Sequence, residues 1–274
     1  MPAGSLYVVG MPIGNAADIT LRALWVLARV DAIAAEDTRV TGPLLRRFGI
    51  ETRLIPAHQH NERKVATEIL ARLASGERVA LVTDAGTPGV SDPGALIVRS
   101  VLDAGRRVIP VPGASSAVAA LSVAGLEPGP FQFIGFLPTG ARERERALRT
   151  AAATGMPFVV FEAPHRIGEL AALLASTLQP ERRVVLAREL SKKFETISTH
   201  TAEELTGLSL EERGEYVVLV DASGPGAAID ATALRWLQAL LEELPPARAA
   251  ALAARVTGMP KESLYALALQ LKQR

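Results

Sequence analysis

The sequence contains no cysteine, which excludes disulfide bonds, thiolate catalysis and cysteine-ligated zinc sites. Aromatic residues make up only 4% of the chain, so extensive stacking on nucleic-acid bases is not expected. No apolar run approaches the length of a membrane span, and the first residues lack a basic segment followed by an apolar one. We therefore expect a cytoplasmic protein that does not enter a membrane.

The net charge is also small, at +1, so the chain lacks the strong overall field of many non-specific nucleic-acid binders. Basic residues gather locally in segments 44–64 and 141–150, where a solvated helix face explains each segment taken singly. Only two of the four histidines, His58 and His60, lie close together. With no other ligand type near them, we expect a polar loop there and no metal site.

Apolar residues are plentiful, at 49% of a chain whose 274 residues suggest two domains. In the first half, helical spacing alternates with apolar runs of strand length, which lie at residues 6–9, 32–35, 79–82 and 107–111. This alternation is typical of a mainly parallel sheet.

The second half predicts another α/β domain, with strands at 131–134, 157–161, 183–186 and 216–220 and a helix at 167–178. Residues 223–228 predict a linker, and the pattern from 246 to 271 is that of a helix–turn–helix or of a plain helical hairpin. We expect α/β domains at 1–112 and 113–223 and a small helical domain at 229–274.

The most informative segment is the loop from Thr83 to Gly94, which follows a predicted buried strand. It holds three glycines and two prolines but no lysine or arginine. Glycine lets a backbone approach a ligand closely and proline stiffens the loop, whereas a phosphate site normally has a cation nearby. The loop therefore predicts a backbone cradle for a neutral or positively charged ligand.

Two other predicted strand ends, at 9–15 and 110–116, are equally free of basic residues. Pro12 breaks the dinucleotide-binding pattern in the first, and no Gly-Lys-Ser follows it. S-adenosylmethionine suits the three loops better, because it has an adenosine, no phosphate and a cationic sulfonium. Asp84, backbone carbonyls and the hydroxyls of Thr87, Ser115 and Ser116 are groups that would receive it, although tight turns alone also explain such loops.

The chain also contains six longer motifs, which occur in this order: Leu6-Tyr-Val-Val-Gly-Met-Pro-Ile-Gly-Asn15, Ala34-Ala-Glu-Asp-Thr-Arg39, Asp84-Ala-Gly-Thr-Pro-Gly-Val-Ser-Asp-Pro-Gly94, Pro112-Gly-Ala-Ser-Ser116, Phe161-Glu-Ala-Pro-His-Arg166 and Ala187-Arg-Glu-Leu-Ser-Lys-Lys-Phe-Glu195. Together they resemble the ribosomal RNA small subunit methyltransferase I family. The resemblance covers residues 5–220 well. One departure is Gly10-Met11, where family members more often have Pro-Thr.

The resemblance implies two α/β domains of tetrapyrrole-methylase type with S-adenosylmethionine in the cleft between them, a small C-terminal helical domain, and a homodimer. It also implies methylation of the 2′-hydroxyl of a cytidine in the decoding region of 16S rRNA, in free RNA or in the small ribosomal subunit. Carried over by motif, mostly as backbone contacts, the cofactor-binding residues are Pro12, Asp84, Ala85, Gly86, Thr87, Pro88, Ser115, Ser116, Phe161, Glu162, Ala187 and Leu190.

A ribose hydroxyl is a weak nucleophile, so a general base or a nearby cation should assist it. Candidates at the motif strand ends are Glu36, Asp37, Glu189 and Lys192. A helix cap also explains Glu36-Asp37, and an ion pair at helical spacing also explains Glu189 with Lys192. Residues expected to hold RNA phosphates or a neighbouring base are Arg39, His165, Arg166 and Lys193.

Two other functions remain open from the residues alone. One is methylation of a small molecule such as a tetrapyrrole on the same fold. The other is a non-catalytic module that binds RNA or a nucleotide. The arginine-rich segment 141–149 and the terminal helices favour RNA over the small molecule.

Overall fold

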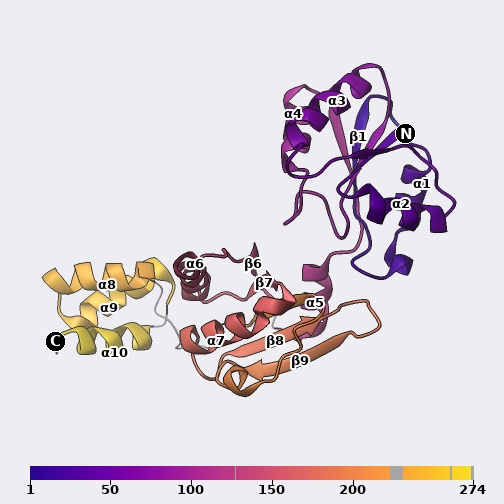
Figure 1. Ribbon diagram of the computed structural model, residues 1–274. Coiled ribbons are helices and arrows are strands. Elements are labelled where there is room, and N and C mark those ends of the chain that lie inside the picture. The colour runs from indigo at the N-terminus through magenta and orange to yellow at the C-terminus, as the bar shows by residue number, and fades with distance from the viewer. Residues whose placement is uncertain (127, 223–230, 260, 273–274) are drawn as a thin grey trace. The chain divides into compact units, whose positions relative to one another are not determined.

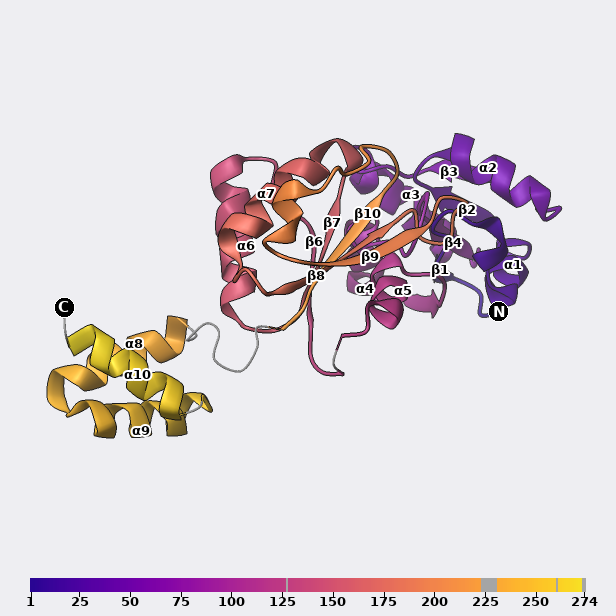
Figure 2. The ribbon, with the colours of Figure 1, turned by 90° about the horizontal axis from the view of Figure 1, so that it is seen from below.

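The computed structural model describes residues 1–126, 128–222, 231–259 and 261–272. It divides into two compact units, drawn in Figures 1 and 2. The first comprises residues 1–123 and 188–196, and the second comprises residues 124–187 and 197–274. The linker expected at 223–228 lies outside the described residues.

The first unit is built on a parallel five-stranded sheet, as the sequence predicts. Its strands are β1 (Ser5–Val9), β2 (Ala32–Ala35), β3 (Leu54–Pro56), β4 (Val79–Val82) and β5 (Arg107–Val111). They lie in the order β3-β2-β4-β1-β5, so all five carboxyl ends meet at one edge of the sheet. The unpredicted strand is β3, which is only three residues long and ends in a proline.

Helices cover both faces of this sheet (Figure 1). On one face lie α1 (Leu21–Leu27) and α2 (Thr38–Arg47), and on the other lie α3 (Glu62–Ala74) and α4 (Ala95–Asp103). Alternate side chains of each strand point to opposite faces. Tyr7 accordingly packs in the cluster with α1, while its neighbour Leu6 packs in the cluster with α3 and α4. Burial on both faces explains why these strands appear in the sequence as continuous apolar runs.

The second unit holds a mixed sheet in the order β6-β7-β10-β8-β9. Its strands are β6 (Gln132–Phe136), β7 (Phe158–Glu162), β8 (Arg183–Arg188), β9 (Thr196–Thr201) and β10 (Tyr216–Val220). The pair β6–β7 is parallel and the pair β7–β10 is antiparallel. Sequence patterning predicts all of these strands except β9, an exposed edge strand with no apolar alternation.

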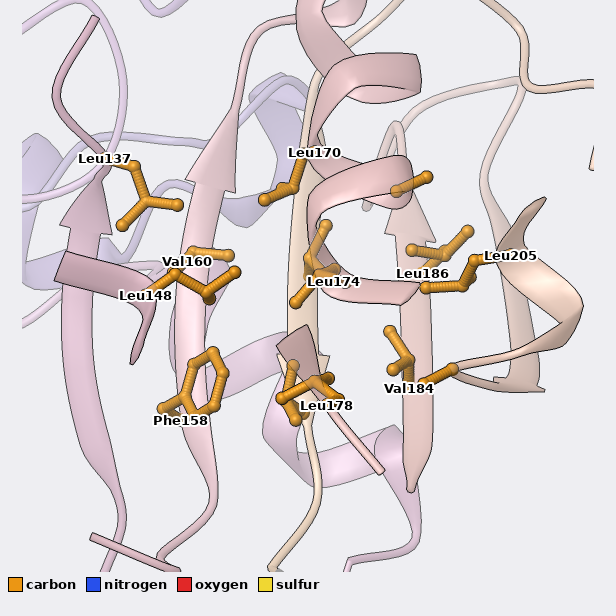
Figure 3. Packing of buried hydrophobic residues seen from close by; sticks show 14 of the residues in the cluster. Leu137, Leu148, Phe158, Val160, Leu170, Leu174, Leu178, Val184, Leu186 and Leu205 are labelled. Carbon is orange, nitrogen blue, oxygen red and sulfur yellow. The ribbon is translucent and has the colours of Figure 1, made fainter. Parts of the chain in front are cut away.

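One hydrophobic cluster joins this sheet to α6 (Ala141–Ala153) and α7 (Ile167–Thr177). Figure 3 shows Leu170 and Leu174 of α7 lying over Val160, Val184 and Leu186 of the strands. All five side chains are almost completely removed from water. Full burial of such a side chain contributes about 1.5–3 kcal/mol, so this face is a main source of the unit's stability.

A buried ion network lies at the end of β7. The guanidinium of Arg144, on the inner face of α6, is 2.5 Å from a carboxylate oxygen of Glu162 and 2.9 Å from one of Glu169. Glu162 is also 3.3 Å from the guanidinium of Arg166. Because Arg144 and Glu162 are both buried, each charge depends on the other for compensation.

The C-terminal residues form three helices, α8 (Ala231–Glu243), α9 (Pro246–Thr257) and α10 (Lys261–Lys272). They share a small core of alanines and leucines, which lets the helices approach closely. Gly258, with φ of +73°, ends α9 in the left-handed conformation that glycine tolerates best. The two helices predicted within 246–271 are thus present, and a third packs with them. Among the described residues, no helix has both the length and the apolar character needed to span a bilayer.

Replacement of Arg144 by methionine should lower the free energy of unfolding by about 3–5 kcal/mol, because Glu162 would be left buried with reduced compensation. Urea titration monitored by circular dichroism measures this change. The matched control is Arg149→Met on the exposed side of α6, where Arg149 pairs with Glu145. That variant should change stability by less than about 1 kcal/mol. Equal losses in the two variants would contradict a special role for the buried pair.

Candidate active site

Three strand ends come together at the carboxyl edge of the first sheet. They are the segments that follow β4, β1 and β5, which are neighbours in that order. The N–H of Met11 donates to the carbonyl of Gly86 over 2.7 Å, and the N–H of Gly10 donates to the carbonyl of Val111 over 3.0 Å. The three loops predicted to share a site are therefore joined by backbone contacts.

The closest of these contacts involves two glycines. A Cβ atom added to Gly10 would lie 2.7 Å from the nitrogen of Gly113, and one added to Gly113 would lie 2.5 Å from the carbonyl oxygen of Gly10. Neither position leaves space for a side chain, since both distances are below any normal carbon contact. The glycines thus serve first to bring two strand ends together, in addition to any approach to a ligand.

Three carboxylates follow β2 and β4 at the same edge. The N–H of Asp37 donates to Asp84 over 3.1 Å, and the N–H of Asp84 donates to Glu36 over 3.3 Å. Asp37 caps α2 through the N–H of Arg39 at 2.8 Å, and it also pairs with the Arg39 guanidinium at 2.6 Å. The structure therefore brings Glu36, Asp37 and Asp84 together and makes Asp37 a helix cap.

The two aspartates of this group have opposite pKa shifts. The side-chain and backbone hydrogen bonds from Arg39 lower the pKa of Asp37 from its ordinary 3.8 to about 2. Loss of hydration raises the pKa of Asp84, and the negative charge of Asp37 adds to that shift. Asp37 thus stays ionised in acid, whereas Asp84 is the more easily protonated of the two.

A fourth segment, residues 188–196, reaches this unit after β8. The hydroxyl of Ser191 donates to the carboxylate of Asp18, and the side chain of Lys192 lies where a Cβ of Gly14 would be. The Lys192 ammonium is 2.8 Å from the Glu189 carboxylate. Glu189 and Ser191 both have positive φ, a strained conformation for residues with side chains.

The other residues predicted to bind the cofactor or RNA in the first unit lie in the same loops or in the segment 188–196. Pro12 and Leu190 are buried. The hydroxyl of Ser115, just before α5 (Ser116–Ala124), accepts the N–H of Val118. The ammonium of Lys193 lies 5.5 Å from the centre of the Phe194 ring. The remaining loop residues Ala85, Gly86, Thr87 and Pro88 belong to the segment after β4.

A second group of predicted residues lies at the end of β7, in the second unit. Phe161 contacts Phe133 and Phe136 edge to face, and the Glu162 side chain is held in the buried ion network. His165 and Arg166 follow in a short 3₁₀ helix, Pro164–Arg166. Because the Glu162 side chain is paired with Arg144, its backbone is the part that can contact a ligand. Ala187, within β8, is completely buried.

Sequence reasoning missed four residues of the first-unit arrangement: Gly14, Asp18, Gly113 as a contact of Gly10, and Ser191. No local pattern marks Asp18, because its partner lies 173 residues away. The helix α1 that follows is capped by Thr20, which accepts the N–H of Ala23 at 3.0 Å. Over the residues that the structure describes, no cluster of His, Asp and Glu has the arrangement of a metal site.

Comparison with known proteins assigns families to both parts of the chain. Residues 5–206 match the family described as Tetrapyrrole (Corrin/Porphyrin) Methylases, and residues 227–272 match the RsmI C-terminal HTH domain. Solved structures with this fold include the methyltransferase CobJ, with a TM-score of 0.62 and 23% identity over 81% of this chain and 95% of that one. A Thermus thermophilus uroporphyrin-III C-methyl transferase complexed with S-adenyl homocysteine has a TM-score of 0.57, with 20% identity over 79% and 96%.

Much more similar in sequence are proteins named ribosomal RNA small subunit methyltransferase I. The Pseudomonas aeruginosa protein is 49% identical over 98% of both chains. The protein of Neisseria meningitidis serogroup B is 48% identical over 99% of this chain and 95% of its own length. The Escherichia coli O157:H7 protein is 46% identical over 97% and 95%.

Replacement of Arg39 by alanine should return the pKa of Asp37 from about 2 towards 3.8, because the largest cause of the shift is the Arg39 side chain. A lowered carboxyl pKa contributes stability that is present above the unfolded pKa and is lost as the pH falls through the folded pKa. At neutral pH the variant should therefore lose the part of the Asp37 contribution that depends on the Arg39 side chain, while the backbone hydrogen bond from residue 39 remains. Carbon-detected NMR titration measures the shift, with Arg47→Ala at the other end of α2 as control. An unchanged Asp37 titration would contradict this assignment.

Proposed function

The chain belongs to the ribosomal RNA small subunit methyltransferase I family, and we propose that it methylates the 2′-hydroxyl of a cytidine in 16S rRNA. The methyl donor is S-adenosylmethionine. The observation that carries the proposal is the joining of three strand ends that contain no lysine or arginine. Because phosphate-binding loops normally have a cation nearby, these ends suit a donor that has no phosphate and is itself positive. Lys192 reaches Gly14 from another segment, but its ammonium is paired with the Glu189 carboxylate at 2.8 Å.

The chemistry of the strand ends fits the donor. Backbone groups of residues 85–88 and the hydroxyls of Ser115 and Ser116 are suited to the polar atoms of an adenosine and an amino acid. Asp84 supplies a negative charge at the same edge and is available to a cation or a ribose. When bound, the donor supplies an electrophilic methyl group, and the loops serve to orient it. Holding two reactants in line supplies much of the rate of such a transfer.

Among the acid–base candidates, Glu189 and Lys192 suit the reaction best. A carboxylate whose pKa is about 2 is a weak base, and Asp37 is already engaged as a helix cap and with Arg39. Glu36 accepts the N–H of Asp84 over 3.3 Å, and among the described residues it has no paired cation that would stabilise a developing alkoxide. We propose that the Lys192 ammonium stabilises the developing negative charge on the ribose oxygen while Glu189 accepts the hydroxyl proton. Contact of Lys192 with Gly14 holds this pair beside the β1 loop.

We also propose that exposed basic residues of the site contact phosphates of the RNA. Arg39 and Lys193 are exposed in the first unit, where they are accessible to phosphates. Arg166 is less accessible, because its guanidinium is near Glu162 and donates to the carbonyl of Pro138 over 3.4 Å.

We further propose a cytoplasmic homodimer that acts on the small ribosomal subunit. Exposed aromatics on the edge strand β6, such as Phe133 and Phe136, support a protein contact there.

The decisive experiment supplies small ribosomal subunits from cells lacking this activity, together with S-adenosylmethionine labelled in its methyl group. Mass spectrometry of the digested 16S rRNA should then show a labelled 2′-O-methylcytidine. Reactions without protein, and reactions offering a tetrapyrrole in place of subunits, are the controls. Absence of methylated cytidine, or label found only in the tetrapyrrole, would overturn the proposal.

Replacement of Lys192 by alanine should lower kcat by about 100-fold or more, the usual contribution of a positioned proton-transfer group. The Kd of S-adenosylmethionine, measured by calorimetry, should be unchanged, because the donor is held by the other loops. The neighbouring Lys193→Ala variant should instead raise the KM for rRNA and leave kcat intact. A Lys192→Ala enzyme with normal turnover would remove Lys192 from the mechanism.

A further inference from the structure

The connection between β3 and α3 lies at the same sheet edge as the candidate site but outside it. The order β3-β2-β4 places the end of β3 one strand beyond the carboxylates at the end of β2. A direct contact ties this connection to the glycine loop, since the carboxylate of Glu62 accepts the N–H of Gly94. Residues 57–64 are therefore neighbours of the loop from Thr83 to Gly94.

This connection and the first turn of α3 carry four basic residues, which we name the β3–α3 surface: His58, His60, Arg63 and Lys64. All four residues are exposed. The acidic residue within the same stretch is Glu62, and its carboxylate is engaged with Gly94. Neither Arg63 nor Lys64 forms an ion pair with an acidic side chain in the described part of the chain. The positive charges of Arg63 and Lys64 are thus accessible to an external anion.

A role in folding does not account for these cations. Arg63 and Lys64 lie in the first turn of α3, where the helix dipole already places positive charge and added cations are unfavourable. The residue before the helix, Asn61, makes no capping hydrogen bond and instead donates to the carbonyl of Pro56 over 3.0 Å. By contrast, the dipole does explain Arg46 and Arg47, which lie in the last turn of α2.

We infer that the β3–α3 surface binds phosphates of the rRNA strand while the target nucleotide occupies the site. The inference rests on the proposed function. Phosphate contacts from lysine and arginine position a nucleic acid without reading its sequence. Beside this surface, Glu36, Asp37 and Asp84 form a mainly acidic stretch, in which the exposed Arg39 guanidinium pairs with Asp37 and only partly offsets the negative charge. The charges along the edge therefore direct the polyanion to β3 and leave the loops after β4, β1 and β5 to the methyl donor.

The test compares two pairs of adjacent, exposed basic residues in the first unit. Arg63→Ala/Lys64→Ala removes charge from the β3–α3 surface, and Arg106→Ala/Arg107→Ala removes the same charge where β5 begins, at the opposite edge. Binding of small-subunit rRNA is measured by filter retention over a range of salt concentrations. The first variant should bind at least about 10-fold more weakly, with the slope of log K against log salt reduced by about 0.7–0.9 per lost contact. The control variant should match the wild type.

The methylation assay gives a second readout. The first variant should show a raised KM for rRNA with the same kcat and the same Kd for S-adenosylmethionine. Ultraviolet crosslinking of the unmodified protein to rRNA should yield crosslinked peptides that contain residues 58–64. Equal weakening in the two variants, unchanged binding in the first, or crosslinks confined to other segments would overturn the inference. Failure of the wild-type protein to methylate rRNA would instead count against the proposed function, because the binding and crosslinking results stand independently of turnover.

Discussion

The backbone contact between Gly10 and Gly113 is the constraint on which the candidate site depends. It sets how closely the ends of β1 and β5 approach, at a separation that no side chain permits. The hydrogen bond between Met11 and Gly86 then fixes the end of β4 to the same assembly. With three loops joined in this way, their backbone groups are oriented before any ligand arrives, and little conformational entropy remains to be lost on binding.

Charge along the sheet edge is the second organising feature. Parallel strands direct all their carboxyl ends to one side, so the chemistry of each loop is set out in the strand order β3-β2-β4-β1-β5. Basic side chains follow β3, carboxylates follow β2 and β4, and loops without lysine or arginine follow β4, β1 and β5. A small net charge of +1 conceals this separation, because opposite charges on neighbouring loops cancel in the total. Under the proposed function, this separation keeps the loops for the cationic donor apart from the surface for the polyanionic substrate.

Local sequence patterns predicted most of the strands and helices and the three loops that form the candidate site, but not the contacts between distant segments. Buried strands such as β4 and β10 are apolar along their whole length, so composition alone marks them. The exposed edge strand β9 and the three-residue β3 carry no such signal, because pairing with a neighbour and not burial defines them. Likewise, the hydrogen bonds of Ser191 with Asp18 and of Gly94 with Glu62 join segments that no spacing rule connects.

Asp37 illustrates why the sequence allowed two interpretations of the Glu36-Asp37 motif, a helix cap and a general base. A carboxylate at the start of a helix is both a good cap and a plausible base, and the sequence does not reveal which partners surround it. In the structure, Arg39 supplies a backbone and a side-chain donor, and together they lower the pKa of Asp37 to about 2. The same bonds that make Asp37 an effective cap therefore make it a poor proton acceptor. Glu189 and Lys192, the pair proposed for acid–base work, are held against the β1 loop by a strained backbone and by contact with Gly14.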